Sequence, residues 1–120
     1  MTRVEFAIAE DEVWFSAFDV FPRTEATPGD DFVRGIGIPL SETEELHVSW
    51  DVRHHSVRIR YQRGPGVVVD VFRELVTVLT VESRETGPVI AMEYRAEGCG
   101  GRTCVETRPA FSLTDVLLQT

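Results

Sequence analysis

The sequence predicts an α+β fold, in which a mostly antiparallel sheet of about six to seven strands, built from hairpins, carries one main helix on one face. Two observations lead to this prediction. Several segments alternate apolar and polar residues, which is typical of strands with one buried face. One segment, Val67–Ser83, instead repeats its apolar residues at helical spacing. With 120 residues, the chain is expected to form a single domain, residues 1–120, whose core needs no metal or disulfide.

The clearest hairpin covers Leu46–Arg63. Its apolar residues alternate with polar ones on both sides of a turn at His54-His55, at Leu46, Val48, Trp50, Val52, Val57, Ile59 and Tyr61. A two-residue turn places Asp51 opposite Arg58, where the two side chains form an ion pair. Arg60 then has no acid directly opposite. If this hairpin lies at a sheet edge, it can also pair with a second subunit, which leaves a homodimer open.

The first part of the chain is expected to contain a second hairpin. Its strands are Val4–Ile8, which alternates, and Val13–Phe18, which is apolar on both faces, with a tight acidic turn at Glu10–Glu12 between them. The aromatic side chains of this region are expected in the core, namely Trp14, Phe15, Phe18 and Phe21.

A loop and a third strand follow. Pro22–Asp31 combines prolines, a glycine and charges, which is typical of a loop. Phe32–Ile38 is predicted to be a strand, in which Gly35 and Gly37 indicate a bulge or a close approach of another group to the backbone.

Val67–Ser83 is predicted to be the main helix. Its apolar residues follow the i, i+3, i+4, i+7 pattern at Val68, Val71, Phe72, Leu75, Val76 and Leu79. The segment is also longer than most strands. Valine and threonine favour strands, so an extended start of this segment stays open. Gly64-Pro65-Gly66 and Gly87-Pro88 mark its two ends.

The last part of the chain is predicted to form two strands and a short helix. Pro88–Ala96 alternates, and Thr103–Arg108 is the return strand after a glycine-rich turn. Ser112–Asp115 is similar to a capping box, so Leu113–Gln119 is expected to be a terminal helix.

The charge of the chain restricts its partners. A formal net charge of −8 argues against binding to nucleic acid or an anionic membrane, since both select basic surfaces. No apolar run has the length of a membrane span, and the N-terminal segment lacks the apolar core of a signal peptide. We therefore expect a cytoplasmic protein without nucleic-acid or membrane partners. The negative charge favours solubility or attraction to a basic protein.

The first candidate site is the arginine-rich face of the hairpin. Leu46–Arg63 carries four arginines and one acid, a local charge of +3, so the remainder of the chain carries −11. Arginine forks match phosphates and carboxylates. The predicted anion- or ligand-binding residues are Arg53, Arg58, Arg60 and Arg63. A small-molecule or anion-binding domain, or an enzyme, would use this face with Tyr61 or His47 nearby. The alternative is a solvated polar face of the sheet.

The second candidate site is a set of acidic turns. The predicted partner-binding residues are Glu10, Asp11, Glu12, Glu42, Glu44 and Glu45. Acidic turns can mimic an anionic ligand, dock onto a basic protein and steer its association. The alternative is that these side chains are only solvated.

No metal, cofactor or catalytic residue is predicted. His54-His55 together with Cys99 and Cys104 would supply zinc ligands, but the turn is exposed and the cysteine spacing is loose. A local disulfide between these cysteines is disfavoured in a reducing cytoplasm. The chain lacks the Gly-x-Ser-x-Gly sequence, the dinucleotide fingerprint and the phosphate loop.

One segment resembles a known family. Gly101-Arg102-Thr103-Cys104-Val105-Glu106 is similar to the C-terminal strand of an immunity-protein family of bacterial polymorphic toxin systems. In that family the strand follows a helix and usually ends in Trp, whereas here Thr107 takes that position and a predicted strand intervenes. The resemblance carries no functional residue to this chain. Together with the small size, the acidity and the lack of a catalytic motif, it leads us to expect a non-enzymatic protein-binding domain, such as an immunity protein or an inhibitor of a basic toxin.

Overall fold

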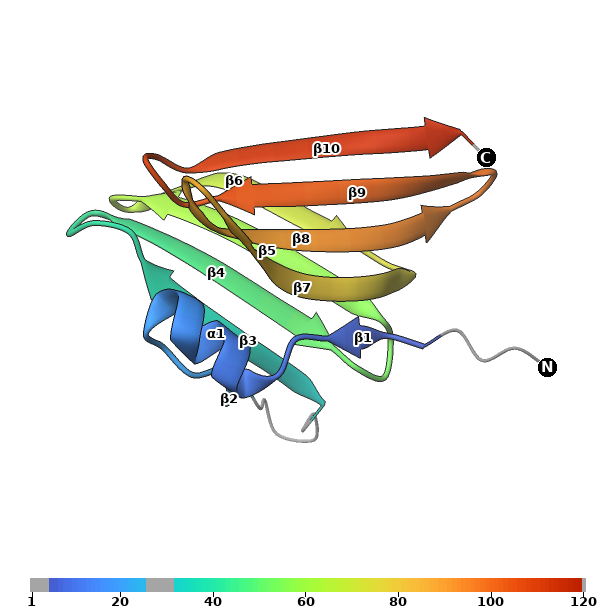
Figure 1. The fold of residues 1–120 in the computed structure, drawn as a ribbon, viewed down its shortest axis with the longest axis horizontal. Helices are drawn as coiled ribbons and strands as arrows, with labels where there is room; N and C mark the ends of the chain where they lie inside the picture. The colour runs from blue at the N-terminus through green and yellow to red at the C-terminus, as the bar shows by residue number, and fades with distance from the viewer. Residues whose placement is uncertain (1–4, 26–31, 120) are drawn as a thin grey trace.

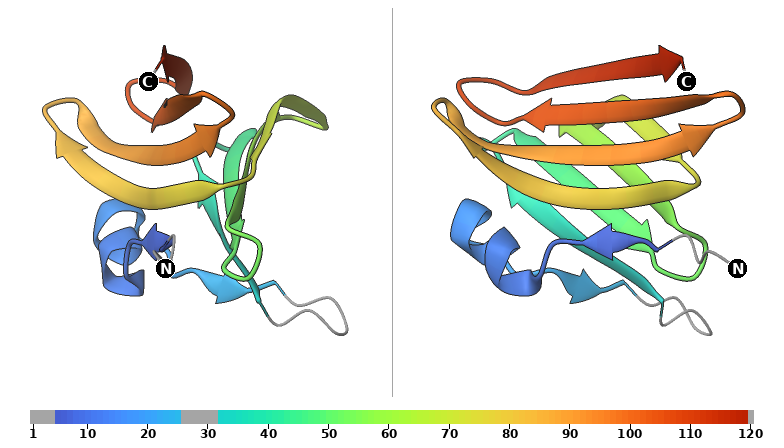
Figure 2. Two further views of the ribbon diagram at one scale, coloured as in Figure 1. Left: turned by 90° about the vertical axis from the view of Figure 1, so that its right-hand side faces the viewer. Right: turned by 45° about the vertical axis from the view of Figure 1, so that its right-hand side comes forward.

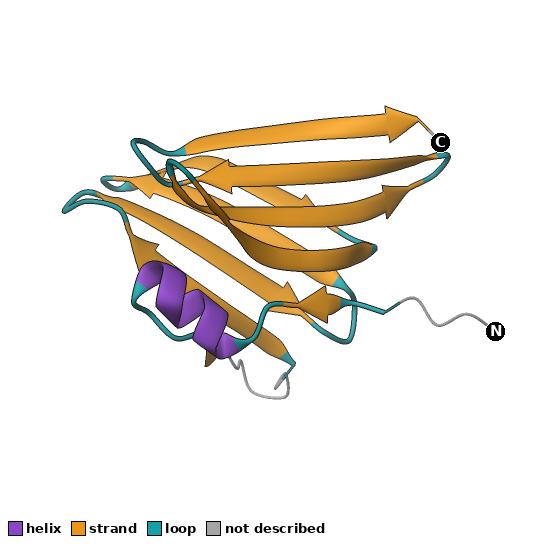
Figure 3. Cartoon of the chain, viewed as in Figure 1, coloured by secondary structure: helices purple, strands orange, loops and turns teal. Residues whose placement is uncertain are grey.

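A computed structural model describes residues 5–25 and 32–119, which form two β-sheets and one short helix (Figure 1). In chain order the elements are β1 (Ala7–Ile8), α1 (Asp11–Phe18), β2 (Arg23–Thr24), β3 (Val33–Pro39), β4 (Glu44–Asp51), β5 (Ser56–Arg63), β6 (Gly66–Arg73), β7 (Val76–Arg84), β8 (Gly87–Ala96), β9 (Cys99–Glu106) and β10 (Ser112–Gln119). Strands account for most of the described residues (Figure 3). The predicted α+β class, with six to seven strands and a main helix, is therefore wrong.

The two sheets contain five strands each. We call β1-β7-β8-β9-β10 the first sheet and β2-β3-β4-β5-β6 the second sheet. Strand β1 pairs with β7 in parallel, and the other described pairings are antiparallel. The sheets are strongly rotated relative to each other, and α1 lies in the corner between them (Figure 2). Their inner faces share one apolar core.

The predicted helix Val67–Ser83 is two strands, β6 and β7, that belong to different sheets. The chain changes sheet at a corner where Leu75 adopts a φ of 57°. Backbone hydrogen bonds hold the corner, from Val76 N to His55 O at 2.9 Å and from Arg95 N to Leu75 O at 3.0 Å. Each of the two strands repeats its apolar residues with a period of two. Because the repeat is interrupted at the corner, the apolar residues of the whole segment fall at spacings that resemble those of a helix. The strand preference of valine decides the outcome.

The segment Val13–Phe18 lies in α1 and not in a strand. Asp11 and Glu12 occupy the first helical turn, where negative charge interacts favourably with the helix dipole. Trp14 and Phe18 share one face because they are four residues apart, and their ring centres are 6.2 Å apart. The predicted acidic turn is thus a helix start, and the predicted hairpin does not form.

The surroundings of α1 differ from the prediction in two further ways. Phe15 and Phe21 are 41% and 51% exposed and stack on each other at 4.3 Å, so these two rings are not core residues. Strand β1 covers only Ala7–Ile8 and pairs with β7. Val4 and part of the predicted loop, residues 26–31, lie outside the described residues.

The hairpin of β4 and β5 is confirmed, with a register that differs by two residues from the prediction. A four-residue turn, residues 52–55, replaces the predicted two-residue turn. Trp50 therefore lies opposite Val57, and Ser49 lies opposite Arg58. A shift by two residues keeps every side chain on its predicted face. Strands β3 and β6 flank the hairpin, so neither of its strands is a sheet edge.

The C-terminal part forms three strands. Strands β8 and β9 confirm the predicted pair of strands. The predicted helix Leu113–Gln119 is strand β10, which pairs with β9 from Ser112 to Gln119. Backbone pairing along the whole segment outweighs the local capping pattern, as tertiary context often does.

The core is centred on a pair of stacked indoles. Trp14 of α1 lies 5.3 Å from Trp50 of β4, with an interplanar angle of 14°. Trp14 is completely buried, and its Nε1 donates to Ala9 O at 3.1 Å. The other buried apolar side chains of this cluster are Ile36, Ile38, Leu46, Val48, Val57, Ile59, Val76, Leu79, Ile90, Met92, Tyr94 and Val105. The helix thus fills the corner between the sheets.

A polar cluster joins the two sheets on the side where β6 and β10 meet. Asp115 accepts hydrogen bonds from Arg73 Nη2, Tyr94 Oη and Thr103 Oγ1 at 2.9, 2.9 and 2.7 Å. Burial opposes ionisation of Asp115, but these three donors outweigh it and lower its pKa. The Tyr94 ring lies where a Cβ of Gly101 would stand, so only glycine leaves room for this arrangement.

We predict that Trp14→Ala lowers the free energy of unfolding by about 3–5 kcal/mol, because a fully buried indole is lost and its cavity cannot refill. Phe15→Ala is the matched control on the same helix and should cost no more than about 1 kcal/mol, since Phe15 is half exposed. Urea unfolding followed by circular dichroism measures both. Equal losses in the two variants would contradict the central position of Trp14.

We predict that Asp115→Asn lowers the free energy of unfolding by about 1–3 kcal/mol near pH 7, because a carboxylate with three donors is lost. A carboxyl whose pKa is lowered by folding stabilises the protein above its unfolded pKa, and this contribution disappears as pH falls. The difference from wild type should therefore shrink below about pH 4. Urea unfolding across pH measures it, and a pH-independent difference would contradict this account.

Candidate functional site

The outer face of the second sheet carries the arginines of β5. Asp70 of β6 binds both Arg58 and Arg60. Arg58 donates from Nε and Nη2 to the two oxygens of Asp70 at 2.9 and 2.7 Å. Arg60 Nε lies 3.5 Å from Asp70 Oδ2. The hydrogen bonds from Arg58 lower the pKa of Asp70 and keep it charged. The two arginines thus share one carboxylate.

The predicted ion pair between Asp51 and Arg58 is wrong, because the longer turn moves these residues apart. Asp51 instead organises the turn. Its Oδ1 accepts from the backbone N of Arg53 at 2.9 Å and of His54 at 3.2 Å, and its Oδ2 lies 2.8 Å from His54 Nδ1. Burial opposes ionisation of Asp51, but the hydrogen bonds from His54 and Arg53 outweigh it and lower its pKa.

The structure does not bring Arg53 and Arg63 to Arg58 and Arg60. Arg53 lies in the turn, with its guanidinium 4.8 Å from the centre of the Phe32 ring. Arg63 ends β5 and donates to the Tyr61 hydroxyl at 3.2 and 3.3 Å. Strand β5 has 8 residues, and a strand of that length spans about 23 Å. Of the four predicted residues, only Arg58 and Arg60 are therefore brought together, at Asp70.

Two glycines of β3 allow carboxylates to lie against this face. The Glu25 carboxylate occupies the position of a Cβ at Gly35, and Glu45 Oε1 lies 2.7 Å from a Cβ position at Gly37. Glu25 Oε1 is hydrogen-bonded to His47 Nε2 at 2.5 Å. The predicted close approach at these glycines is thus confirmed. Acids and bases alternate across this face.

Sequence reasoning missed Asp70 and Glu25 as partners of this face. Asp70 lies within the predicted helix Val67–Ser83, although the valines on either side of it, Val69 and Val71, fit the alternation of a strand. Glu25 had no local signal, because its contact with His47 joins residues that are far apart in the chain.

A recess of about 540 Å³ opens on the same face beside the β4–β5 turn. It is lined by Val33, Ser49, Trp50, Asp51, His54, Ser56, Arg58, Phe72 and Glu74. Arg58, Asp51 and Glu74 all line it, so the recess contains charges of both signs. Within residues 5–25 and 32–119, no group of three His, Cys, Asp or Glu side chains is placed to hold a metal ion.

The first group of acidic residues, Glu10–Glu12, begins α1. Asp11 receives two hydrogen bonds from Arg34 of β3, at 2.7 and 2.9 Å. These hydrogen bonds lower the pKa of Asp11. Glu10 and Glu12 are exposed. Asp11 is therefore part of the contact between the helix and the second sheet, whereas its two neighbours face solvent.

In the second group, Glu42 lies in the turn between β3 and β4, and Glu44 and Glu45 begin β4. Glu44 accepts a hydrogen bond from the Tyr61 hydroxyl and another from Ser41 Oγ at 3.1 Å, and these contacts lower its pKa. Glu42 and Glu45 are exposed beside a recess of about 410 Å³. The turn and the first residues of β4 thus carry two exposed carboxylates, those of Glu42 and Glu45.

The two acidic groups lie toward opposite ends of β3. Arg34, the partner of Asp11, is near the start of the strand, and Pro39 ends it before the second group. Five residues of extended chain span about 17 Å. A partner that contacts both groups must therefore extend along β3.

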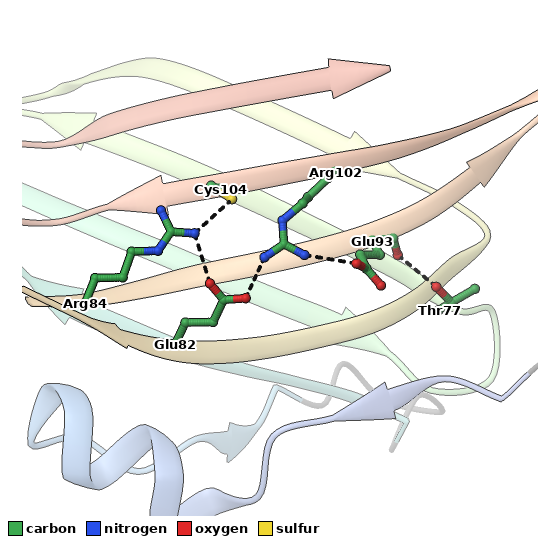
Figure 4. Close-up of polar contacts among 6 residues, drawn as sticks. All are labelled: Thr77, Glu82, Arg84, Glu93, Arg102 and Cys104. Atoms are coloured by element: carbon green, nitrogen blue, oxygen red, sulfur yellow. Dashed lines mark hydrogen bonds and ion pairs between the residues drawn. The ribbon is translucent and has the colours of Figure 1, made fainter. Parts of the chain in front are cut away.

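The segment Gly101–Glu106 forms most of β9. Thr103 and Val105 are buried in the core, and Arg102 and Cys104 project to the outer face of the first sheet (Figure 4). Arg102 donates to Glu82 at 2.5 Å and to Glu93 at 2.9 Å, and Arg84 donates to Glu82 at 2.9 Å. This network joins β7, β8 and β9.

Comparisons with known proteins give a match of fold. No family model matches this chain, and no curated protein matches it. It is similar to a chain of the "Contact-dependent growth inhibition toxin - immunity protein complex from Klebsiella pneumoniae 342", with a TM-score of 0.79 and 11% sequence identity. The match covers 98% of this chain and 100% of that chain. The two chains share one fold.

No described helix has the length and apolar character needed to cross a membrane.

We predict that Asp70→Asn uncovers an anion site, because Arg58 and Arg60 lose their shared carboxylate. Sulfate should then raise the melting temperature of this variant by about 3–5 °C more than that of wild type. Glu85→Gln, which removes one acid from an exposed turn of the first sheet, is the control and should respond as wild type does. Thermal unfolding with and without sulfate measures the shifts. An equal response of wild type and Asp70→Asn would show that Asp70 does not mask the arginines.

Proposed function

We propose that this protein is an immunity protein, a non-enzymatic inhibitor that binds a protein toxin. The observation that carries the proposal is the shared fold, over the whole length of both chains, with a chain of a toxin–immunity protein complex. The resemblance of Gly101–Glu106 to a strand of an immunity-protein family supports it. The neutralised arginines of β5 support protein binding over anion binding.

We propose that the toxin is basic and that the acidic turns contact it. The net charge of −8 supports attraction to a basic protein. Of the six acids predicted to bind a partner, Asp11 and Glu44 have internal partners. The exposed pairs Glu10 with Glu12 and Glu42 with Glu45 are then the contact residues. They would occupy the surface with which the toxin binds an anionic ligand.

We also propose a cytoplasmic location. Cys99 and Cys104 are both free thiols on one strand. Free thiols are typical of proteins in a reducing compartment. An inhibitor in that compartment would protect the cell that makes it from a toxin that has entered.

The direct test is protection by co-expression. Proteins encoded by the genes that neighbour the gene of this protein are tested as candidate toxins: each is expressed alone and together with this protein, and cell growth is recorded. Restored growth, with a complex that copurifies, is the expected result. A toxin that stays fully active despite a folded, abundant partner would contradict the proposal.

We predict that Glu42→Lys with Glu45→Lys weakens toxin binding about 10-fold or more at low salt, because two contact charges are reversed. The matched control is Glu85→Lys with Glu97→Lys, which changes the net charge equally at exposed turns of the first sheet. The control should weaken binding about 2-fold or less. Calorimetric titration at two salt concentrations measures both. Equal weakening would contradict a contact at the β3–β4 turn.

A further inference from the structure

Strand β10 is an uncovered edge of the first sheet. It pairs with β9 on one side, and among the described residues no strand pairs with its other side (Figures 1 and 2). Val116, Leu117 and Leu118 are 47%, 63% and 60% exposed. Because neighbouring side chains of a strand point to opposite faces, these three consecutive residues place exposed apolar side chains on both faces of β10. An edge of this kind offers backbone N–H and C=O groups together with apolar side chains to a second strand.

This edge lacks the features that normally prevent strand pairing. Soluble proteins protect edges with lysine, proline, bulges or inward charges. Strand β10 contains no Lys, Arg or Pro, and its single charged residue, Asp115, is bound to Arg73 of the same chain. Strand β6, an edge strand of the second sheet, does have such protection, because it carries Asp70 and pairs with β5 through an irregularity at Tyr61/Gln62.

We propose that β10 pairs antiparallel with β10 of a second copy of this chain, in a register centred on Leu117. The two copies are then related by a twofold axis, and the two first sheets join into one continuous sheet. Leu117 faces Leu117, and Val116 faces Leu118 of the other copy. Residues opposite each other share a face in such a pair. The proposal is independent of the proposed function.

The register follows from apolar matching and charge. Centring on Leu117 places each Asp115 opposite Gln119 and keeps the two carboxylates apart. Centring on Val116 would place Asp115 opposite Leu117, which loses the apolar match. Shifting by a single residue would join the inner face of one first sheet to the outer face of the other.

The surroundings of Leu117 enlarge the apolar surface. Leu117 lines a groove of about 430 Å³ together with Phe72 and Leu75, which are 50% and 59% exposed, and the charged residues Arg73, Glu74, Arg95 and Asp115 also line it. Contiguous exposed apolar surface of this kind marks interaction sites. The exposed acids Glu42 and Glu45 belong to the second sheet, so pairing through β10 leaves them accessible to another partner.

A cross-linking experiment tests the register on the purified chain alone. Leu117→Cys is introduced in a background that carries Cys99→Ser and Cys104→Ser. Opposite residues of an antiparallel pair have Cα atoms about 4.5–5.5 Å apart, which permits a disulfide. Thr114→Cys in the same background is the control, since the two copies of this residue would be about 20 Å apart. Mild oxidation should give a covalent dimer with Leu117→Cys and none with Thr114→Cys.

Analytical ultracentrifugation over a concentration series tests the association itself. Wild type should show a monomer–dimer equilibrium, and Val116→Lys with Leu118→Lys should be monomeric because like charges would face each other. Val67→Lys with Val68→Lys, on the exposed edge of β6, is the matched control and should still dimerise. Circular dichroism verifies that each variant is folded.

The proposal is overturned when wild type is monomeric at every concentration and the Leu117→Cys variant forms no cross-linked dimer. A strand of another protein would then be the occupant to test. A dimer lost only in the β6 variant would equally overturn the proposal. Neither outcome depends on a toxin, so failure here and failure of the proposed function are distinguishable.

Discussion

The burial of Trp14 against Trp50 is the interaction on which the arrangement of the two sheets depends. Helix α1 has 8 residues, a length at which an isolated helix is marginal in water. It forms because its indole is fully enclosed between the inner faces and stacks on β4 at 5.3 Å. Asp11 adds a paired hydrogen bond to Arg34 of β3. The helix is thus fixed to the second sheet while it fills the corner beside the first.

The opposite side of the core is closed by polar groups. Asp115 joins Arg73 of the second sheet to Tyr94 and Thr103 of the first, and Gly101 provides the space for the tyrosine ring. This cluster positions β10, in which three consecutive apolar side chains, Val116, Leu117 and Leu118, are exposed. The contacts that complete the fold therefore also determine which edge remains available to another chain.

Charge distribution separates two kinds of surface. On the outer face of the second sheet, Asp70 pairs with Arg58 and Arg60, so opposite charges cancel locally, and Glu25 is hydrogen-bonded to His47. At the β3–β4 turn and at the start of α1, exposed glutamates lack such partners among the contacts described above. Exposed negative charge therefore lies mainly at turns and at the start of α1, whereas Arg58 and Arg60 are paired within the sheet.

The sequence by itself determined the strands whose patterns are local. Alternation in Leu46–Arg63 and Pro88–Ala96 predicted strands and most of their buried residues, although Val52 and Ala96 are exposed, and Gly35 and Gly37 indicated a close approach at β3. It did not determine the register of the hairpin, because a longer turn shifts the pairing without changing either face. The helix predicted at Val67–Ser83 and the strand predicted at Val13–Phe18 were both wrong for one reason. Short apolar runs fit either period, and only contacts between distant segments decide between them. The partners Asp70 and Glu25, the two-sheet arrangement and the open edge of β10 arise from such contacts, so tertiary structure alone decided them.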